Sequence, residues 1–164
     1  MGFLHQAGAA AILITLTLAV QSAGMAALIN WGITHLRETY RLGLVRSAVL
    51  MVRFTSVMIG LHIAQILLWA GFYRWSCFPS WESAFYFSTT SYSTVGYGDL
   101  VLPPMWRNLG PVESVTGVLM CGLSASFLFA IVTRLVEREE KFLLQPAKPA
   151  GERTSTVERQ TVRR

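Results

Sequence analysis

Residues 80–99 read SWESAFYFSTTSYSTVGYGD, an apolar and hydroxyl-rich run that is too broken to cross a membrane as one helix. Ser80 is a favourable N-cap, and Glu82 places negative charge at the positive end of a helix, so a short helix is predicted over 80–93. The glycines after Ser93 cannot continue that helix. A half-helix followed by extended backbone is tolerated at membrane depth only where it is buried in protein or lines a water-filled path. The stretch therefore predicts a re-entrant segment.

Three long apolar segments surround this stretch. Hydrophobic residues make up 52% of the 164-residue chain and charged residues only 14%, whereas a soluble domain carries about a quarter charged residues. A membrane-spanning helix takes about 20 apolar residues, and segments of this kind run over about 8–31, 54–73 and 111–136. The sequence therefore predicts an all-α membrane protein with three transmembrane helices, one re-entrant helix and the loop that follows it.

The distribution of charge predicts how the chain is oriented. The connection over 34–53 carries four arginines against one acidic residue, namely Arg37, Arg41, Arg46 and Arg53 against Glu38. The positive-inside rule places this connection and the C-terminus in the cytoplasm, with the N-terminus and the re-entrant segment outside. The basic linker is expected to contact anionic lipid. The basic residues are not interleaved with aromatics on one face, so no nucleic-acid partner is expected.

A cleaved signal peptide is the alternative for the first apolar segment. A signal peptide begins with a positively charged region, and no Lys or Arg precedes this run. Cleavage would also leave the arginine-rich connection outside. A retained helix is therefore expected. Twelve arginines against two lysines point to a bacterial source, and hence to the bacterial plasma (inner) membrane.

The six residues 94–99, TVGYGD, follow the predicted half-helix and precede a predicted spanning helix. In this context the sequence resembles the tetrameric potassium channel family, in its bacterial-type form with one pore loop per subunit. A glycine-rich turn between two helices is the plain alternative, but it leaves the half-helix unexplained. The resemblance covers about 54–136 and leaves the first helix outside. It implies passive conduction with K⁺ as the permeant ion and no cofactor.

The motif has a physical reason for its composition. K⁺ must shed its water, and rows of backbone carbonyl oxygens can replace the hydration shell. Successive carbonyls point to one side only if the backbone alternates in handedness, and Gly96 and Gly98 adopt left-handed dihedrals without a Cβ clash. The expected filter is Thr94, Val95, Gly96, Tyr97 and Gly98, with K⁺ held at the first four and the side chains of Val95 and Tyr97 pointing away from the axis. One motif per chain supplies one oxygen per layer, which predicts a homotetramer.

The resemblance also assigns residues that support the filter. Tyr86 and Phe87 match the consecutive aromatics that pack around the filter tyrosine. Some members carry a glutamate at the position of Thr90, paired with the aspartate that matches Asp99; that pairing is absent here. Gly117 lies where the inner helix of the family commonly bends, so it is a candidate gating hinge, with close helix packing as the alternative.

The resulting domain organisation is an N-terminal transmembrane helix (1–33), a basic cytoplasmic linker (34–53), a pore domain (54–136) and a charged, largely disordered cytoplasmic tail (137–164). Within the pore domain we expect an outer helix (54–73), a pore helix (80–93), the filter (94–98) and an inner helix (111–136). One helix before the pore unit cannot form a four-helix voltage sensor.

Four polar residues in the apolar segments have weaker interpretations. His62 and Gln65 lie within the second helix, and a neutral His62 bonded to another helix is favoured over a functional ionisable group. Glu113 is expected to cap the third helix after Pro111. Ser124 is a candidate for facing the inner cavity.

The sequence thus predicts a potassium-selective channel subunit. One alternative is a weakly selective cation channel, whose filter would usually depart from the motif at Tyr97. The other is a non-conducting accessory membrane subunit, against which the intact motif argues. No nucleophile, base and orienting group converge in the sequence, so enzymatic activity is not expected.

Overall fold

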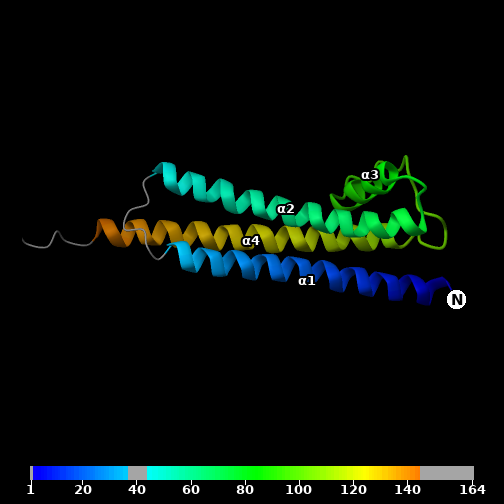
Figure 1. Ribbon diagram of the computed structural model, residues 1–164, viewed down its shortest axis with the longest axis horizontal. Coiled ribbons are helices and arrows are strands. Elements are labelled where there is room, and N and C mark those ends of the chain that lie inside the picture. Colours follow the sequence, from blue (N-terminus) through cyan, green and yellow to red (C-terminus); the bar gives the residue numbers. More distant parts are fainter. Residues whose placement is uncertain (1, 37–43, 145–164) are drawn as a thin grey trace, which may run out of the picture. The chain divides into compact units, whose positions relative to one another are not determined.

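The computed structural model describes residues 2–36 and 44–144, and these form four helices (Figure 1). They are α1 (Gly2–Leu36), α2 (Leu44–Ser76), α3 (Trp81–Tyr92) and α4 (Leu109–Leu143). Neither described range contains a strand. The predicted all-helical fold is therefore confirmed for the part of the chain that the structure describes.

Three of the helices are long and apolar enough to cross a membrane. The candidate spans are Leu4–Gly32, Ser47–Ser76 and Leu109–Arg134. Even the shortest has 26 residues, against about 20 needed for the hydrocarbon core. Three spans were predicted, and the three helices that could form them are present.

Helix α2 begins at Leu44, whereas the sequence placed the start of the outer helix at Phe54. Residues 44–52 read LVRSAVLMV, which contains no glycine or proline, so nothing interrupts the helix before Arg53. The guanidinium of Arg53 lies over the Trp31 ring, with Cζ 4.6 Å from the ring centroid. The charge of Arg53 within an apolar run is therefore not a helix boundary. It makes a cation–π contact with Trp31 of α1.

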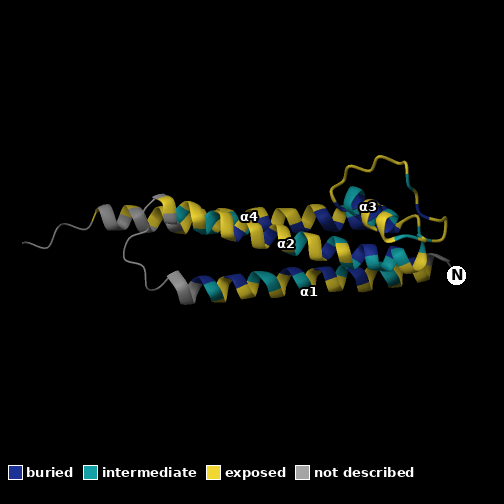
Figure 2. Cartoon of the chain, turned by 45° about the horizontal axis from the view of Figure 1, so that its top comes forward, coloured by how far each residue is buried: buried dark blue, intermediate teal, exposed yellow. Residues whose placement is uncertain are grey.

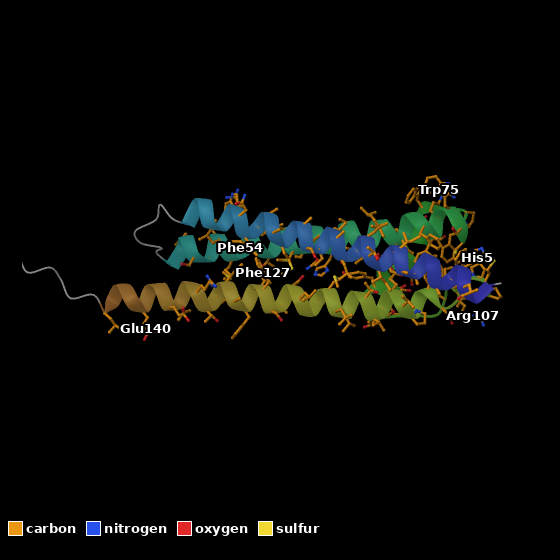
Figure 3. All side chains as sticks on the ribbon, turned by 90° about the horizontal axis from the view of Figure 1, so that it is seen from below. His5, Phe54, Trp75, Arg107, Phe127 and Glu140 are labelled. Carbon is orange, nitrogen blue, oxygen red and sulfur yellow. The ribbon has the colours of Figure 1, made fainter. Side chains whose placement is uncertain are left out.

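The chain divides into two compact units, residues 1–131 and 132–164. The first contains α1, α2, α3 and α4 as far as Ile131, while the described part of the second is the remainder of α4. In the first unit, Figure 3 places His5, Trp75 and Arg107 at one end and Phe54 and Phe127 toward the other. Consecutive spans therefore run antiparallel in this unit.

Two apolar clusters form the core of the first unit. The cluster beside α3 is built around the buried Trp69, Tyr73, Phe87 and Leu109. A second cluster, farther along the helices, centres on Leu28, Phe54 and Met58, with Phe127 packed against it. Figure 2 shows the buried face of α3 in dark blue and much of the loop after it in yellow. Helix α3 therefore presents one face to the core. Most of the loop that follows it is exposed, although Leu102 of this loop is buried in the cluster beside α3.

Helix α1 packs directly on α2, a contact that the sequence left open. The indole Nε1 of Trp69 donates to Thr17 Oγ1 at 3.0 Å. Gly24 faces Leu61 closely enough that a Cβ there would lie 2.3 Å from Leu61 Cδ2. The first helix is therefore joined to the second by a hydrogen bond as well as by small-residue packing.

Several predictions fall on residues that the structure does not describe. Arg37 and Arg41 of the basic linker and residues 145–164 of the tail lie outside the described ranges, and the side chain of Arg46 is likewise not described. The expected contact of the linker with anionic lipid and the expected disorder of the tail therefore stay predictions.

Candidate functional site

Helix α3 carries the N-cap that its sequence predicts and ends close to where the sequence placed its end. Ser80 Oγ accepts a hydrogen bond from the backbone N–H of Ser83 at 3.1 Å, and Glu82 lies in the first turn. The helix ends at Tyr92, and the C-cap Ser93 donates its N–H to Thr89 O at 3.1 Å. The short helix predicted over 80–93 corresponds to α3 with its two caps.

The loop after α3 has a backbone that alternates in handedness. Thr94, Gly96 and Gly98 have φ values of +64°, +51° and +79°. We call residues 94–98 the strip. Every second residue of the strip is thus left-handed, the conformation that the glycines were expected to adopt. Thr94 was not expected there, because a β-branched residue in this region costs about 1–3 kcal/mol.

The strip is anchored at both ends. On the α3 side, Thr94 N–H donates to Ser91 O at 3.0 Å and Gly96 N–H to Thr90 O at 3.1 Å. Past its other end, the Tyr86 hydroxyl donates to Asp99 Oδ2 at 2.7 Å. This hydrogen bond raises the pKa of the Tyr86 phenol above its ordinary value. Thr90, which was assigned a supporting role through its position, thus contributes its backbone carbonyl.

Between these anchors the strip leaves its side chains outside the core of the subunit. Val95 is 51% exposed and Tyr97 is 73% exposed. A Cβ at Gly96 or Gly98 would meet nothing within 4 Å among the described residues. The conformation of the strip therefore rests on backbone handedness and its two anchors rather than on packing within one subunit.

The two consecutive aromatics of α3 point in different directions. Tyr86 is exposed and bonds Asp99. Phe87 is buried, with its ring centroid 5.1 Å from that of Tyr73 and 5.5 Å from that of Phe78. The structure therefore places Phe87 in the core behind α3, and the expected packing of both aromatics around the filter tyrosine stays a prediction.

Glu113 has a different role from the one that its position suggested. A carboxylate caps a helix from within its first turn. Helix α4 begins at Leu109, so Glu113 lies beyond that turn. Its side chain is fully buried. Tyr73 donates to its Oε2 at 2.9 Å, and Ser88 Oγ lies 2.5 Å from its Oε1. The capping prediction is therefore wrong: Glu113 joins α4 to α2 and to the back of α3.

A second polar cluster surrounds the last residue of α3. The hydroxyl of Tyr92 bonds Gln65 and His62 of α2, which agrees with the favoured interpretation of His62. Gln65 also bonds Gln21 of α1. Gln21 in turn donates to Ser124 of α4 at 2.9 Å. Ser124 is only 5% exposed, so within the subunit it faces α1 and not an open cavity.

Sequence reasoning missed Gln21, which looked like a mere interruption of an apolar run. A signal was present, because Thr17 and Gln21 are four residues apart and so share one face of a helix. Gln65 and Trp69 of α2 have the same spacing, and each bonds its counterpart on α1. Two matched polar pairs within two apolar helices indicate a shared interface.

Gly117 lies at a close approach between α4 and the end of α3. It is buried, and a Cβ there would be 2.2 Å from the backbone oxygen of Tyr92. This contact is direct support for the packing interpretation. The role of Gly117 as a gating hinge stays a prediction.

The comparison with known families assigns the class of protein. The family described as "Ion channel" matches residues 49–134, which is more than half of the chain. The chain belongs to the ion channel family. The matched region begins in α2, encloses α3 and the strip, and ends within α4, so α1 lies outside it. No curated protein and no solved structure matches the chain.

Family and fold together confirm the coarser predictions. The protein is an integral membrane protein of the ion channel family, with three apolar helices long enough to span the bilayer.

Among the described residues, no group of His, Cys, Asp and Glu is placed to hold a metal ion.

Proposed function

We propose that this ion channel conducts K⁺ selectively and that the strip is its selectivity filter. The observation that carries the proposal is the alternation of left-handed residues at Thr94, Gly96 and Gly98. Such a backbone directs successive carbonyl oxygens to one side, where they can replace the water around a dehydrated K⁺. The Thr94 hydroxyl would add a further oxygen ligand.

The placement of α3 supports this function. Its C-terminal end adjoins the strip, and the negative end of a helix macrodipole stabilises a cation. Helix α3 is held from behind by Ser88 and Tyr92, so its axis has a fixed direction in the subunit. We infer that α3 is the pore helix and that it directs this negative potential toward the ion path.

We further propose a homotetramer. One strip offers a single carbonyl per layer, so an ion can be enclosed only by several chains, and a closed ring of four is the expected symmetric solution. The exposed side chains of Val95 and Tyr97 would then pack on neighbouring subunits. The measurement is the mass of the purified channel in native detergent micelles; a dimeric mass would contradict the proposal.

The proposed orientation places the N-terminus and the strip outside and the C-terminus in the cytoplasm. It rests on the arginine-rich connection between α1 and α2. At the proposed outer end, Trp75 at the end of α2 and Trp81 at the start of α3 are 91% and 58% exposed. Such residues suit a membrane–water interface.

The deciding experiment is the reversal potential of the purified channel in a planar bilayer, with K⁺ on one side and Na⁺ on the other. The proposal predicts a value close to the K⁺ equilibrium potential. A value near zero would indicate a weakly selective cation channel. The absence of current at every voltage and pH tested would favour a non-conducting accessory subunit.

A further inference from the structure

A line of hydrogen bonds crosses the first unit from the end of α3 to the middle of α4. His62 Nδ1 lies 2.9 Å from the Tyr92 hydroxyl, which donates to Gln65 Oε1. Gln65 Nε2 donates to Gln21 Oε1 at 2.7 Å, and Gln21 Nε2 donates to Ser124 Oγ at 2.9 Å. Four helices therefore share one continuous polar connection, which we call the relay.

The relay runs in one consistent direction. A hydroxyl has a single hydrogen, so Tyr92 can donate to Gln65 only if His62 Nδ1 carries the hydrogen that points at Tyr92. Gln65 then accepts from Tyr92 through its amide oxygen and donates to Gln21 through its amide nitrogen. Gln21 likewise accepts from Gln65 and donates to Ser124. Each member has a donor facing an acceptor, so no rearrangement of the amides is needed.

The relay also lies where water cannot replace it. Gln21 and Gln65 are 1% and 0% exposed, and both lie within the candidate membrane spans. Outside the relay, the one further partner of Gln21 among the described residues is Met25 Sδ, 3.7 Å from Nε2, and sulfur is a weak acceptor. A polar group that loses its partner in such surroundings has no ready substitute.

The relay ends next to the strip. Tyr92 precedes Thr94 by two residues. Its backbone oxygen is packed against Gly117 of α4, while its side chain is held by Gln65 and His62 of α2. Tyr92 is thus fixed from two sides, and the position of the first residues of the strip follows from it.

We propose that α1 is a positioning element of the pore and that Gln21 is its positioning residue. Gln21 fixes the base of the filter through Gln65 and Tyr92, and it couples that base to the inner helix at Ser124. This inference rests on the proposed function of the strip. If Gln21 acted only in helix packing, its loss would weaken the subunit without changing which ion passes.

The test is the ratio of K⁺ to Na⁺ permeability, measured from reversal potentials, in Gln21→Met. Methionine keeps the size of the side chain and removes both hydrogen-bonding ends. We expect the ratio to fall about fivefold, the factor that corresponds to one net hydrogen bond of about 1 kcal/mol. Thr15→Val is the matched control, because Thr15 is an exposed residue of α1 whose hydroxyl donates to Ala11 O of the same helix.

A second variant separates positioning from packing. Gln65→Met interrupts the relay nearer to Tyr92, so we expect a fall in the ratio at least as large. If the relay acts as a unit, the Gln21→Met/Gln65→Met double variant falls no further than Gln65→Met alone. Additive effects of the two substitutions on the ratio would mean that Gln21 acts by a route other than Gln65 and would overturn the proposal.

The outcomes distinguish this inference from the proposed function. A selective wild-type channel with an unchanged ratio in an assembled Gln21→Met channel overturns the inference alone. A non-selective wild-type channel overturns the proposed function and the inference with it. If Gln21→Met does not assemble, Ser124→Ala decides, because it deletes one hydroxyl at the far end of the relay: a lowered ratio supports the coupling, and a wild-type ratio refutes it.

Discussion

The strip and the buried face of α3 are close in the sequence, yet they are held in different ways. The strip is exposed, and its shape comes from the backbone handedness of Thr94, Gly96 and Gly98. The buried face is held by hydrogen bonds that Ser88 and Tyr92 make with two other helices, α2 and α4. The buried face is therefore complete within one subunit, whereas the strip is held only by the backbone N–H groups of Thr94 and Gly96 and, past its other end, by Asp99. Substitutions in the strip should change conduction directly. Substitutions behind α3 should change stability, and those that interrupt the relay should change selectivity as well.

The largest effect is expected for Gly96→Ala. The φ of +51° at Gly96 is unfavourable for any L-residue with a Cβ, while a Cβ there would meet nothing within 4 Å among the described residues. The variant should therefore assemble but lose K⁺ current in the planar bilayer. Normal potassium current in assembled Gly96→Ala channels would show that the strip does not need its left-handed backbone.

Gly117→Ala should destabilise the packing of α4 against the end of α3. The added Cβ would lie 2.2 Å from a backbone oxygen, and overpacking of this kind costs about 3 kcal/mol at the upper end of the usual range. The melting temperature of the assembled channel in detergent should fall clearly. Gly122→Ala is the control, because a Cβ there meets nothing within 4 Å among the described residues. An unchanged melting temperature with a reduced open probability would instead favour the hinge.

Glu113 allows a finer test of the same region. Glu113→Leu removes the partner of the Tyr73 and Ser88 hydroxyls, which should cost about 2 kcal/mol. Glu113→Gln offers Tyr73 an acceptor and Ser88 Oγ a donor. Ser88 can then give its single hydrogen to Ile66 O, which lies 2.9 Å away. Thermal unfolding of both variants should rank Gln close to wild type and Leu well below it; equal losses would show that a carboxyl group is required.

The smallest effect is expected for Tyr86→Phe. This change removes the hydrogen bond to Asp99 at the outer end of the strip, but the site is exposed to solvent, so the loss of stability should be small. The time course of the current is the sensitive measurement, since a strip with one anchor should lose current faster during sustained conduction. A time course identical to wild type would mean that Asp99 does not need this donor.

The sequence was sufficient where structure depends on local rules. The N-cap of α3 at Ser80, the end of that helix near Ser93, the left-handed glycines and the three apolar helices all follow from short-range preferences. The left-handed Thr94 does not, because its own preference opposes that conformation. The one sequence feature that indicates a left-handed Thr94 is its position two residues before Gly96.

Contacts between helices were harder to predict. A single sequence shows which residues are polar within an apolar run, but not which polar residue each one meets. Glu113 was therefore assigned to a helix start and Ser124 to a cavity, although both bond side chains on other helices. The matched spacing of Thr17 and Gln21 with Trp69 and Gln65 was the readable clue to the packing of α1 on α2.

The pairing of α1 with α2 has a consequence for biogenesis. Thr17 and Gln21 enter the bilayer before Trp69 and Gln65 have been synthesised, and polar side chains in lipid hydrogen-bond to those of neighbouring helices. The α1–α2 hairpin should therefore form as soon as α2 is inserted, ahead of α3 and α4. The later helices would then pack on a preformed α1–α2 surface. On that surface Gln65 would already be in position to accept the hydrogen bond from Tyr92.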